Sequence, residues 1–76
     1  MACDIDRAAD MVLALMQLTL HEGRRTWKSY DWEVMNTLFE RGYISDPRSK
    51  AKSVVLTEAG MARGRAMFAR HLEAAV

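Results

Sequence analysis

The sequence has one cysteine and no apolar stretch long enough to cross a lipid bilayer. Cys3 is the single thiol, so no disulfide can form within the chain. The longest apolar run, residues 11–16, is far shorter than the roughly 20 residues of a membrane-spanning helix. The N-terminal stretch MACDIDRAAD is acidic, whereas a secretory signal begins with basic residues. These absences predict a soluble cytoplasmic protein without a membrane partner.

Residues arranged for catalysis or metal binding are also missing from the sequence. His21-Glu22 begins like the zinc motif HExxH, but Arg25 stands where the second histidine is required. Cys3 has no second cysteine or histidine at a zinc-ligand spacing. We therefore expect a protein that is not an enzyme and that has no metal site and no cofactor.

The 76 residues are enough for one small domain, which we expect to span residues 1–76. Half of the residues are hydrophobic, a proportion typical of folded proteins rather than disordered ones. The net charge is only +1, but it is unevenly distributed. Residues 24–52 contain seven basic and four acidic side chains, while residues 1–23 contain one basic and four acidic. An anionic partner is therefore expected to bind the middle of the chain.

Capping residues and hydrophobic spacing predict three helices. Asp4 or Asp6 begins the first helix, and Gly23 is a natural end for it. Asp31 begins a second helix that ends at Gly42, and Thr57 begins a third. The third helix is expected to end near residue 72, although residue 60 is a glycine where a capping box has an acid.

Two short strands are expected between the second and third helices. Residues 43–45 form the first strand, Asp46-Pro47 begins a turn, and the β-branched residues 53–57 form the second strand. The predicted fold is therefore a mostly helical α+β domain with the order helix, loop, helix, two-strand β-hairpin, helix. A two-strand hairpin is marginal alone, so it must pack on the helices.

The first predicted helix is apolar around most of its circumference. Such a helix needs cover on more than one side, and in a short chain a second copy of the protein can supply it. We therefore expect a homodimer whose interface uses the apolar residues Val12, Leu15, Met16 and Leu20.

The order of elements in residues 31–60 resembles the second half of a winged-helix domain. The residues that carry this likeness are Leu38, Gly42, Tyr43, Ile44 and the string Val55-Leu56-Thr57-Glu58-Ala59-Gly60. Winged-helix repressors of the multidrug-resistance regulator type show a similar pattern. The resemblance implies DNA as a partner, with a helix in the major groove and a wing on the phosphates. Residues 24–30 are too few for the additional helix of a complete helix-turn-helix.

The whole chain also resembles an uncharacterised bacterial family of very short proteins. The shared strings are W-K-x-x-D-W at 27–32, G-x-I-S-D-P at 42–47 and K-S-V-V-L-T-E at 52–58. This second resemblance implies no known activity.

The candidate nucleic-acid-binding residues are basic side chains on either side of the second helix. They are Arg24, Arg25, Lys28, Arg48, Lys50 and Lys52. Such residues bind phosphates only if they converge on one surface; otherwise they are a solvated turn that protects a sheet edge. Trp27 and Trp32 are interpreted as core anchors rather than as platforms for stacked bases.

The outward face of the second helix argues against base reading. Glu33 and Glu40 lie on this face, where two carboxylates would oppose a phosphate backbone. Two hypotheses therefore remain open: a nucleic-acid-binding regulatory module, and a protein-interaction module such as an adaptor or small inhibitor.

Overall fold

The computed structural model describes residues 3–74 and shows an α+β fold that is mostly helical. The main helices are α1 (Ile5–Met16), α2 (Trp32–Glu40) and α3 (Glu58–His71). A short 3-10 helix, η1 (Gln17–Thr19), follows α1. The strands are β1 (Arg25–Trp27) and β2 (Ser53–Val55). The predicted fold class is thus confirmed.

The three predicted helix starts are confirmed by side-chain caps. Asp4 accepts a hydrogen bond from the backbone N–H of Arg7, and Asp31 accepts from two backbone N–H groups of α2. The hydroxyl of Thr57 accepts from the backbone N–H of Gly60 at 3.0 Å. Each cap satisfies donors that the first turn of a helix cannot pair internally.

The first helix ends earlier than Gly23, where the sequence places its end. α1 stops at Met16 and η1 follows it, so Gly23 lies beyond the helix. There, Glu22 and Gly23 adopt positive φ angles of 47° and 82° in a tight turn. This turn joins His21 to Arg25, whose backbones exchange hydrogen bonds of 2.9 and 3.1 Å.

The sheet differs from the predicted hairpin in the identity of its partner strands. β2 pairs antiparallel with β1, in the segment predicted to be a connection, and Thr26 faces Val54. The predicted pairing with residues 43–45 persists as a single bridge between Ile44 and Leu56. The β2 segment therefore lies between two partners, one upstream of α2 and one directly after it.

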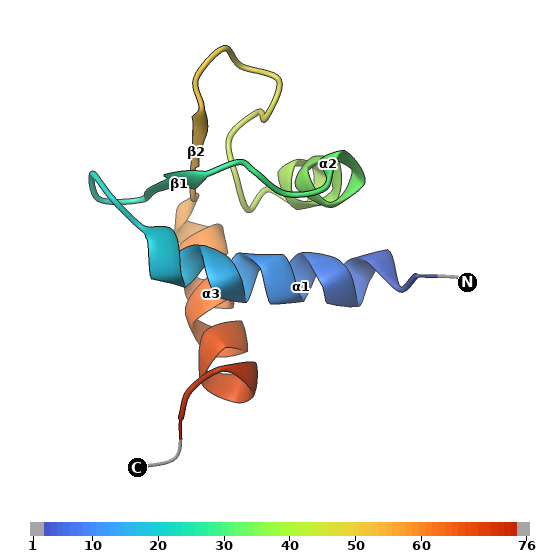
Figure 1. The fold of residues 1–76 in the computed structure, drawn as a ribbon, viewed down its shortest axis with the longest axis vertical. Helices are drawn as coiled ribbons and strands as arrows, with labels where there is room; N and C mark the ends of the chain where they lie inside the picture. Colours follow the sequence, from blue (N-terminus) through green and yellow to red (C-terminus); the bar gives the residue numbers. More distant parts are fainter. Residues whose placement is uncertain (1–2, 75–76) are drawn as a thin grey trace.

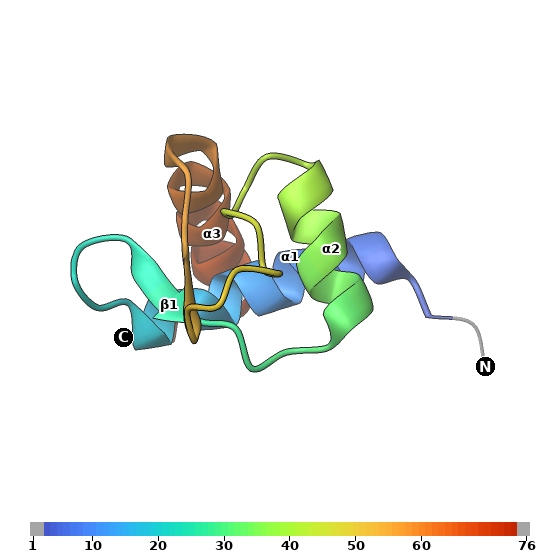
Figure 2. The same ribbon diagram turned by 90° about the horizontal axis from the view of Figure 1, so that it is seen from above.

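The core lies where α2, α3 and the sheet meet α1. Figure 2 shows α2 and α3 at different places along α1, with β1 beyond the end nearer to α3. The buried cluster comes from α1, α2, β2 and the two bridged residues, and α3 packs against it through Met61. Its members are Ala9, Leu13, Met16, Val34, Met35, Leu38, Ile44, Val54 and Leu56. The loop between α2 and β2 extends away from this core (Figure 1).

Candidate nucleic-acid interface

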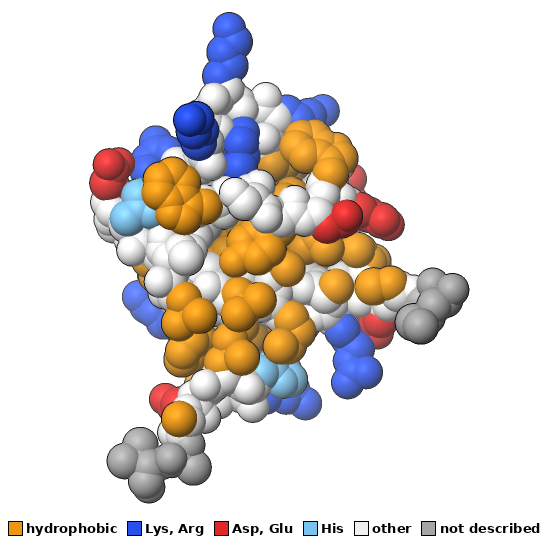
Figure 3. All heavy atoms as spheres, in the orientation of Figure 1, with side chains coloured by type: hydrophobic (Ala, Val, Ile, Leu, Met, Phe, Trp, Pro, Cys, Tyr) orange, Lys and Arg blue, Asp and Glu red, His pale blue; other side chains and the backbone are white. Residues whose placement is uncertain are grey.

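Pairing of β1 with β2 brings the two basic segments of the chain together. The guanidinium of Arg25 donates to the hydroxyl of Ser53 at 3.0 Å. The backbone N–H of Lys28 donates to the carbonyl of Lys52 at 3.4 Å. Figure 3 shows Lys and Arg side chains gathered at this end of the molecule, over the strands and the loop that leads into β2. The convergence needed for phosphate binding is thus present.

Lys28 is used to hold the loop in place. Its ammonium group donates to the carbonyl oxygens of Pro47 at 2.8 Å and Ser49 at 2.6 Å. Pro47 is buried, so this side of the loop is fixed against the strands. Because two of its three donors are engaged, Lys28 acts mainly as a loop clamp rather than as an open phosphate contact.

Arg48 is engaged within the same loop. Its guanidinium donates to both carboxylate oxygens of Asp46, each at 3.1 Å. These hydrogen bonds hold the pKa of Asp46 below its usual value and raise that of Arg48. The pair is solvent-exposed, so a phosphate can still compete for the guanidinium, but it must displace a carboxylate.

Arg24, Lys50 and Lys52 are the candidate cations that remain open. All three are exposed, and none has an ion-pair partner within residues 3–74. Arg25 is partly engaged by other side chains. Its guanidinium donates to the hydroxyl of Ser53 and lies 3.8 Å from a carboxylate oxygen of Glu22.

The prediction that Trp27 and Trp32 are core anchors is wrong. Trp27 is 48% exposed and Trp32 is 53% exposed. In β1, side chains alternate between the two faces, and Thr26 takes the inward position with an exposure of 0%. Its hydroxyl bonds to that of Thr19 at 2.7 Å, which satisfies a polar group in the core. Trp27 is therefore directed outward.

Trp27 forms an aromatic platform beside the basic residues. Its ring stacks on the imidazole of His21 with a centroid distance of 4.3 Å and an interplanar angle of 29°. The platform was missed because β1 was not predicted. The string Arg-Thr-Trp indicates this strand, because it places a β-branched residue beside an aromatic one and both types are enriched in strands.

The outward face of α2 is acidic, as the sequence predicts. Glu33 and Glu40 are exposed, and the hydroxyl of Thr37 is turned back to the carbonyl of Glu33 at 2.9 Å. Arg41, at the C-terminal end of α2, forms an ion pair with Asp6 of α1, and Arg48, which lies over the ring of Phe39, is paired with Asp46. This leaves α2 without free positive charge to approach a DNA groove.

Most of the residues predicted for a dimer interface lie in or against the core. Met16 is completely buried, and Val12 and Leu20 pack against the central cluster. Only Leu15 of the four is exposed, at 37%, whereas Leu18, outside the predicted set, is 65% exposed. Of the predicted interface residues, only Leu15 is thus exposed to a partner, and Leu18 of η1 adds a second exposed leucine.

Two further features concern membranes and metal ions, within the part of the chain that the structure describes. No helix there is both long and apolar enough to span a membrane. Residues 3–74 also contain no cluster of three or more side chains of the types His, Cys, Asp and Glu that could hold a metal ion.

Comparison with known proteins identifies the family but no activity. Residues 4–74 match the family described as "Domain of unknown function (DUF6429)". The chain is also 49% identical over 70 residues to the "Uncharacterized protein y4hR" of Sinorhizobium fredii. That alignment covers 92% of this chain and 95% of the relative. No solved structure gives a significant match. The chain belongs to this family of short domains of unknown function.

Proposed function

We propose that the protein is a non-enzymatic module that binds nucleic acid through the surface formed by β1, β2 and the loop before β2. Arg24, Lys50 and Lys52 contact phosphates, and Trp27 stacks on a base. The observation that carries this proposal is the β1–β2 pairing, which brings cations from two distant segments to the same end of the molecule as an exposed tryptophan. The protein then acts in the cytoplasm, as a regulatory module on a winged-helix-like frame.

Single-stranded nucleic acid fits this surface better than a duplex. An aromatic ring stacks on a base only where the base is unpaired, and such stacking contributes about 1–3 kcal/mol per base. A duplex would instead require a helix in the major groove. α2 is the helix that would have to enter this groove, but it exposes Glu33 and Glu40. Arg41, at its C-terminal end, is paired with Asp6.

The test is fluorescence anisotropy with a labelled single-stranded oligonucleotide and a duplex of equal length, across a salt series. Three phosphate contacts predict a slope of about −2 for log K against log salt on the single strand. The variant Arg24/Lys50/Lys52→Ala should lose most of this slope. The variant Arg7/Arg65/Arg70→Ala makes the same change in net charge on α1 and α3, and should keep it.

A second comparison isolates the aromatic contact. Trp27→Ala should weaken single-strand binding by about fivefold or more, because it removes the stacking platform. Trp32→Ala removes an equally exposed tryptophan from the N-terminus of α2, outside the basic surface, and should have little effect. Equal losses in both variants, or no salt-dependent binding by the wild type, would overturn the proposal.

Homodimerisation is a second candidate function, and a separate observation favours it. Figure 3 shows hydrophobic side chains gathered over α1 and α3, apart from the basic end. Leu15 and Leu18 on α1 and η1 are among the exposed large hydrophobic residues. A dimer through them predicts that sedimentation shows a concentration-dependent mass and that Leu18→Glu gives a monomer. A wild type that stays monomeric at high concentration excludes this function.

A further inference from the structure

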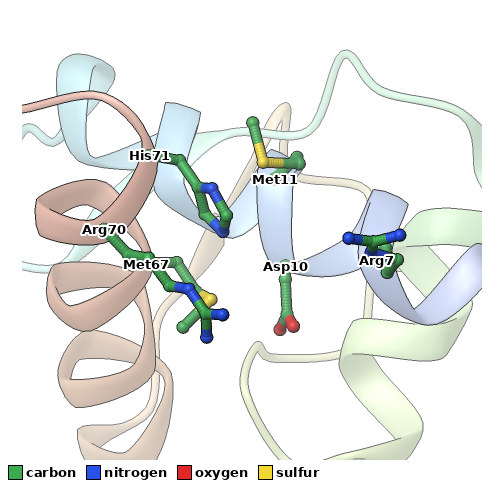
Figure 4. A pocket seen from close by; sticks show the side chains of 6 residues that line it. All are labelled: Arg7, Asp10, Met11, Met67, Arg70 and His71. Carbon is green, nitrogen blue, oxygen red and sulfur yellow. The ribbon is translucent and has the colours of Figure 1, made fainter.

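A cleft lies between α1 and α3, outside the basic surface. Its volume is about 370 Å³, at the lower end of the range for small-molecule sites. Its lining residues come half from each helix: Arg7, Asp10, Met11, Met67, Arg70 and His71. Figure 4 shows the side chains of Arg70 and His71 reaching from α3 toward α1, with Asp10 and Met11 coming from α1.

The single carboxylate of the cleft is already neutralised. Arg63 donates two hydrogen bonds to Asp10, at 3.1 and 2.9 Å, and this pairing raises the pKa of the Arg63 guanidinium. The bridge also fixes α3 against α1 at this point. The remaining charges of the cleft are therefore positive.

Arg7 and Arg70 supply that positive charge from opposite walls. Both are exposed, and no ion pair within residues 3–74 uses either of them. Arg70 and His71 also stand in the last turn of α3, where cations complement the helix dipole. That explanation does not extend to Arg7, which comes early in α1 and faces the positive end of its own helix dipole. An anionic ligand would relieve this unfavourable position.

The remaining lining of the cleft is apolar and adaptable. Met67 is 6% exposed and Met11 is half-buried, so thioether side chains contribute to both walls. One turn beyond Met11, Leu15 continues the apolar surface along α1. Methionine side chains adjust to ligands of different shape because they are unbranched and flexible.

We propose that this cleft binds a small amphipathic carboxylate. The two guanidinium groups hold the carboxylate, and the thioether side chains of Met11 and Met67 cover the apolar chain of the ligand. The lining also contains Asp10, but Arg63 compensates its charge, so the cleft keeps a net positive charge for an anion. Planar guanidinium groups also match the geometry of a carboxylate with two parallel hydrogen bonds.

The test is a titration followed by ¹H–¹⁵N NMR, with octanoate as the probe. Octanoate should shift amide signals of α1 and α3 around the cleft. Octan-1-ol has the same chain without the charge and should bind at least about tenfold more weakly. Equal binding of the alcohol and the acid would show an apolar contact only and would overturn the proposal.

Matched variants locate the site. Arg7/Arg70→Ala should weaken octanoate binding by about tenfold or more, with unchanged circular dichroism. Arg24/Lys50→Ala removes the same charge from the opposite end of the molecule and should leave octanoate binding as it is. If both variants lose affinity equally, or if octanoate shifts no cleft residue, the cleft is not a carboxylate site. Neither outcome affects the nucleic-acid proposal, which depends on other residues.

Discussion

Gly60→Ala is a one-methyl substitution that tests how α3 is attached to the rest of the fold. A Cβ atom at residue 60 would lie 2.0 Å from the carbonyl oxygen of Tyr43 and 2.9 Å from its carbonyl carbon. Both neighbours are backbone atoms, so no side chain can turn aside. Either α3 or the Tyr43 peptide must move by about 1 Å to reach even a tight contact.

The Tyr43 peptide is held from both sides, which makes that movement costly. Its carbonyl accepts the backbone N–H of Thr57 at 3.0 Å, and its own N–H donates to the carbonyl of Leu38 at 3.0 Å. The next residue, Ile44, is buried in the core. Forcing a methyl group into such a site costs about 1–3 kcal/mol, and more where backbone must shift. The higher helix propensity of alanine returns up to about 1 kcal/mol.

Because backbone must shift, the upper end of this cost applies, so we expect Gly60→Ala to lose about 2 kcal/mol of stability, out of roughly 4–11 kcal/mol for a chain of this length. The melting temperature should fall by about 8–16 °C, measured by far-UV circular dichroism. Gly64→Ala is the control in the same helix. A Cβ there meets the side-chain amide of Gln17 at 2.4 Å, which can rotate away, and the backbone carbonyl oxygen of Leu13 at 3.2 Å, which needs a shift of only a few tenths of an ångström, so the change should stay within about 1 kcal/mol. Wild-type stability of Gly60→Ala would refute the reasoning.

Three other measurements test the remaining contacts. The pKa of the Asp46 carboxyl should lie below 3.8 by NMR and should rise toward that value in Arg48→Ala, because the guanidinium stabilises the carboxylate. The stability that the Asp46–Arg48 pair contributes is fully present above pH 3.8. It is lost as the pH falls through the lowered pKa that Asp46 has in the folded protein. The coupling energy between Asp10 and Arg63 should be less than about 1 kcal/mol, since both side chains are partly exposed. A double-mutant cycle with Asp10→Asn and Arg63→Gln measures it. Leu13→Ala should cost about 2–5 kcal/mol in urea denaturation, because Leu13 is fully buried in α1.

The helices could be predicted because their start signals are local. Asp4, Asp31 and Thr57 each bind backbone N–H groups two or three residues away, so the pattern is readable without knowing the fold. The incomplete capping box at Gly60 has a cause that is not local. The approach of Tyr43 excludes any side chain at that position, including the acid that the box requires.

The candidate site could be predicted only in part, because it depends on strand pairing. The six basic residues were identified by charge, but their convergence follows from the register of β1 on β2. The same register directs Thr26 inward and Trp27 outward. Hydrophobicity alone favours a buried tryptophan, and here the alternation of the strand overrides it.

The placement of β2 between partners from both sides of α2 has a consequence for the speed of folding. Arg25 and Ser53 meet across 28 positions of the chain, so this pairing requires closure of a long loop before any sheet contact forms. The helices, with contacts three and four residues apart, can form long before that. Closure of this loop should therefore be one of the slow steps of folding, together with the packing of α3 on α1, where Asp10 and Arg63 meet across 53 positions. A shortened chain that begins after β1 would retain the turn at residues 46–49 but would have lost the longer of the two β2 pairings.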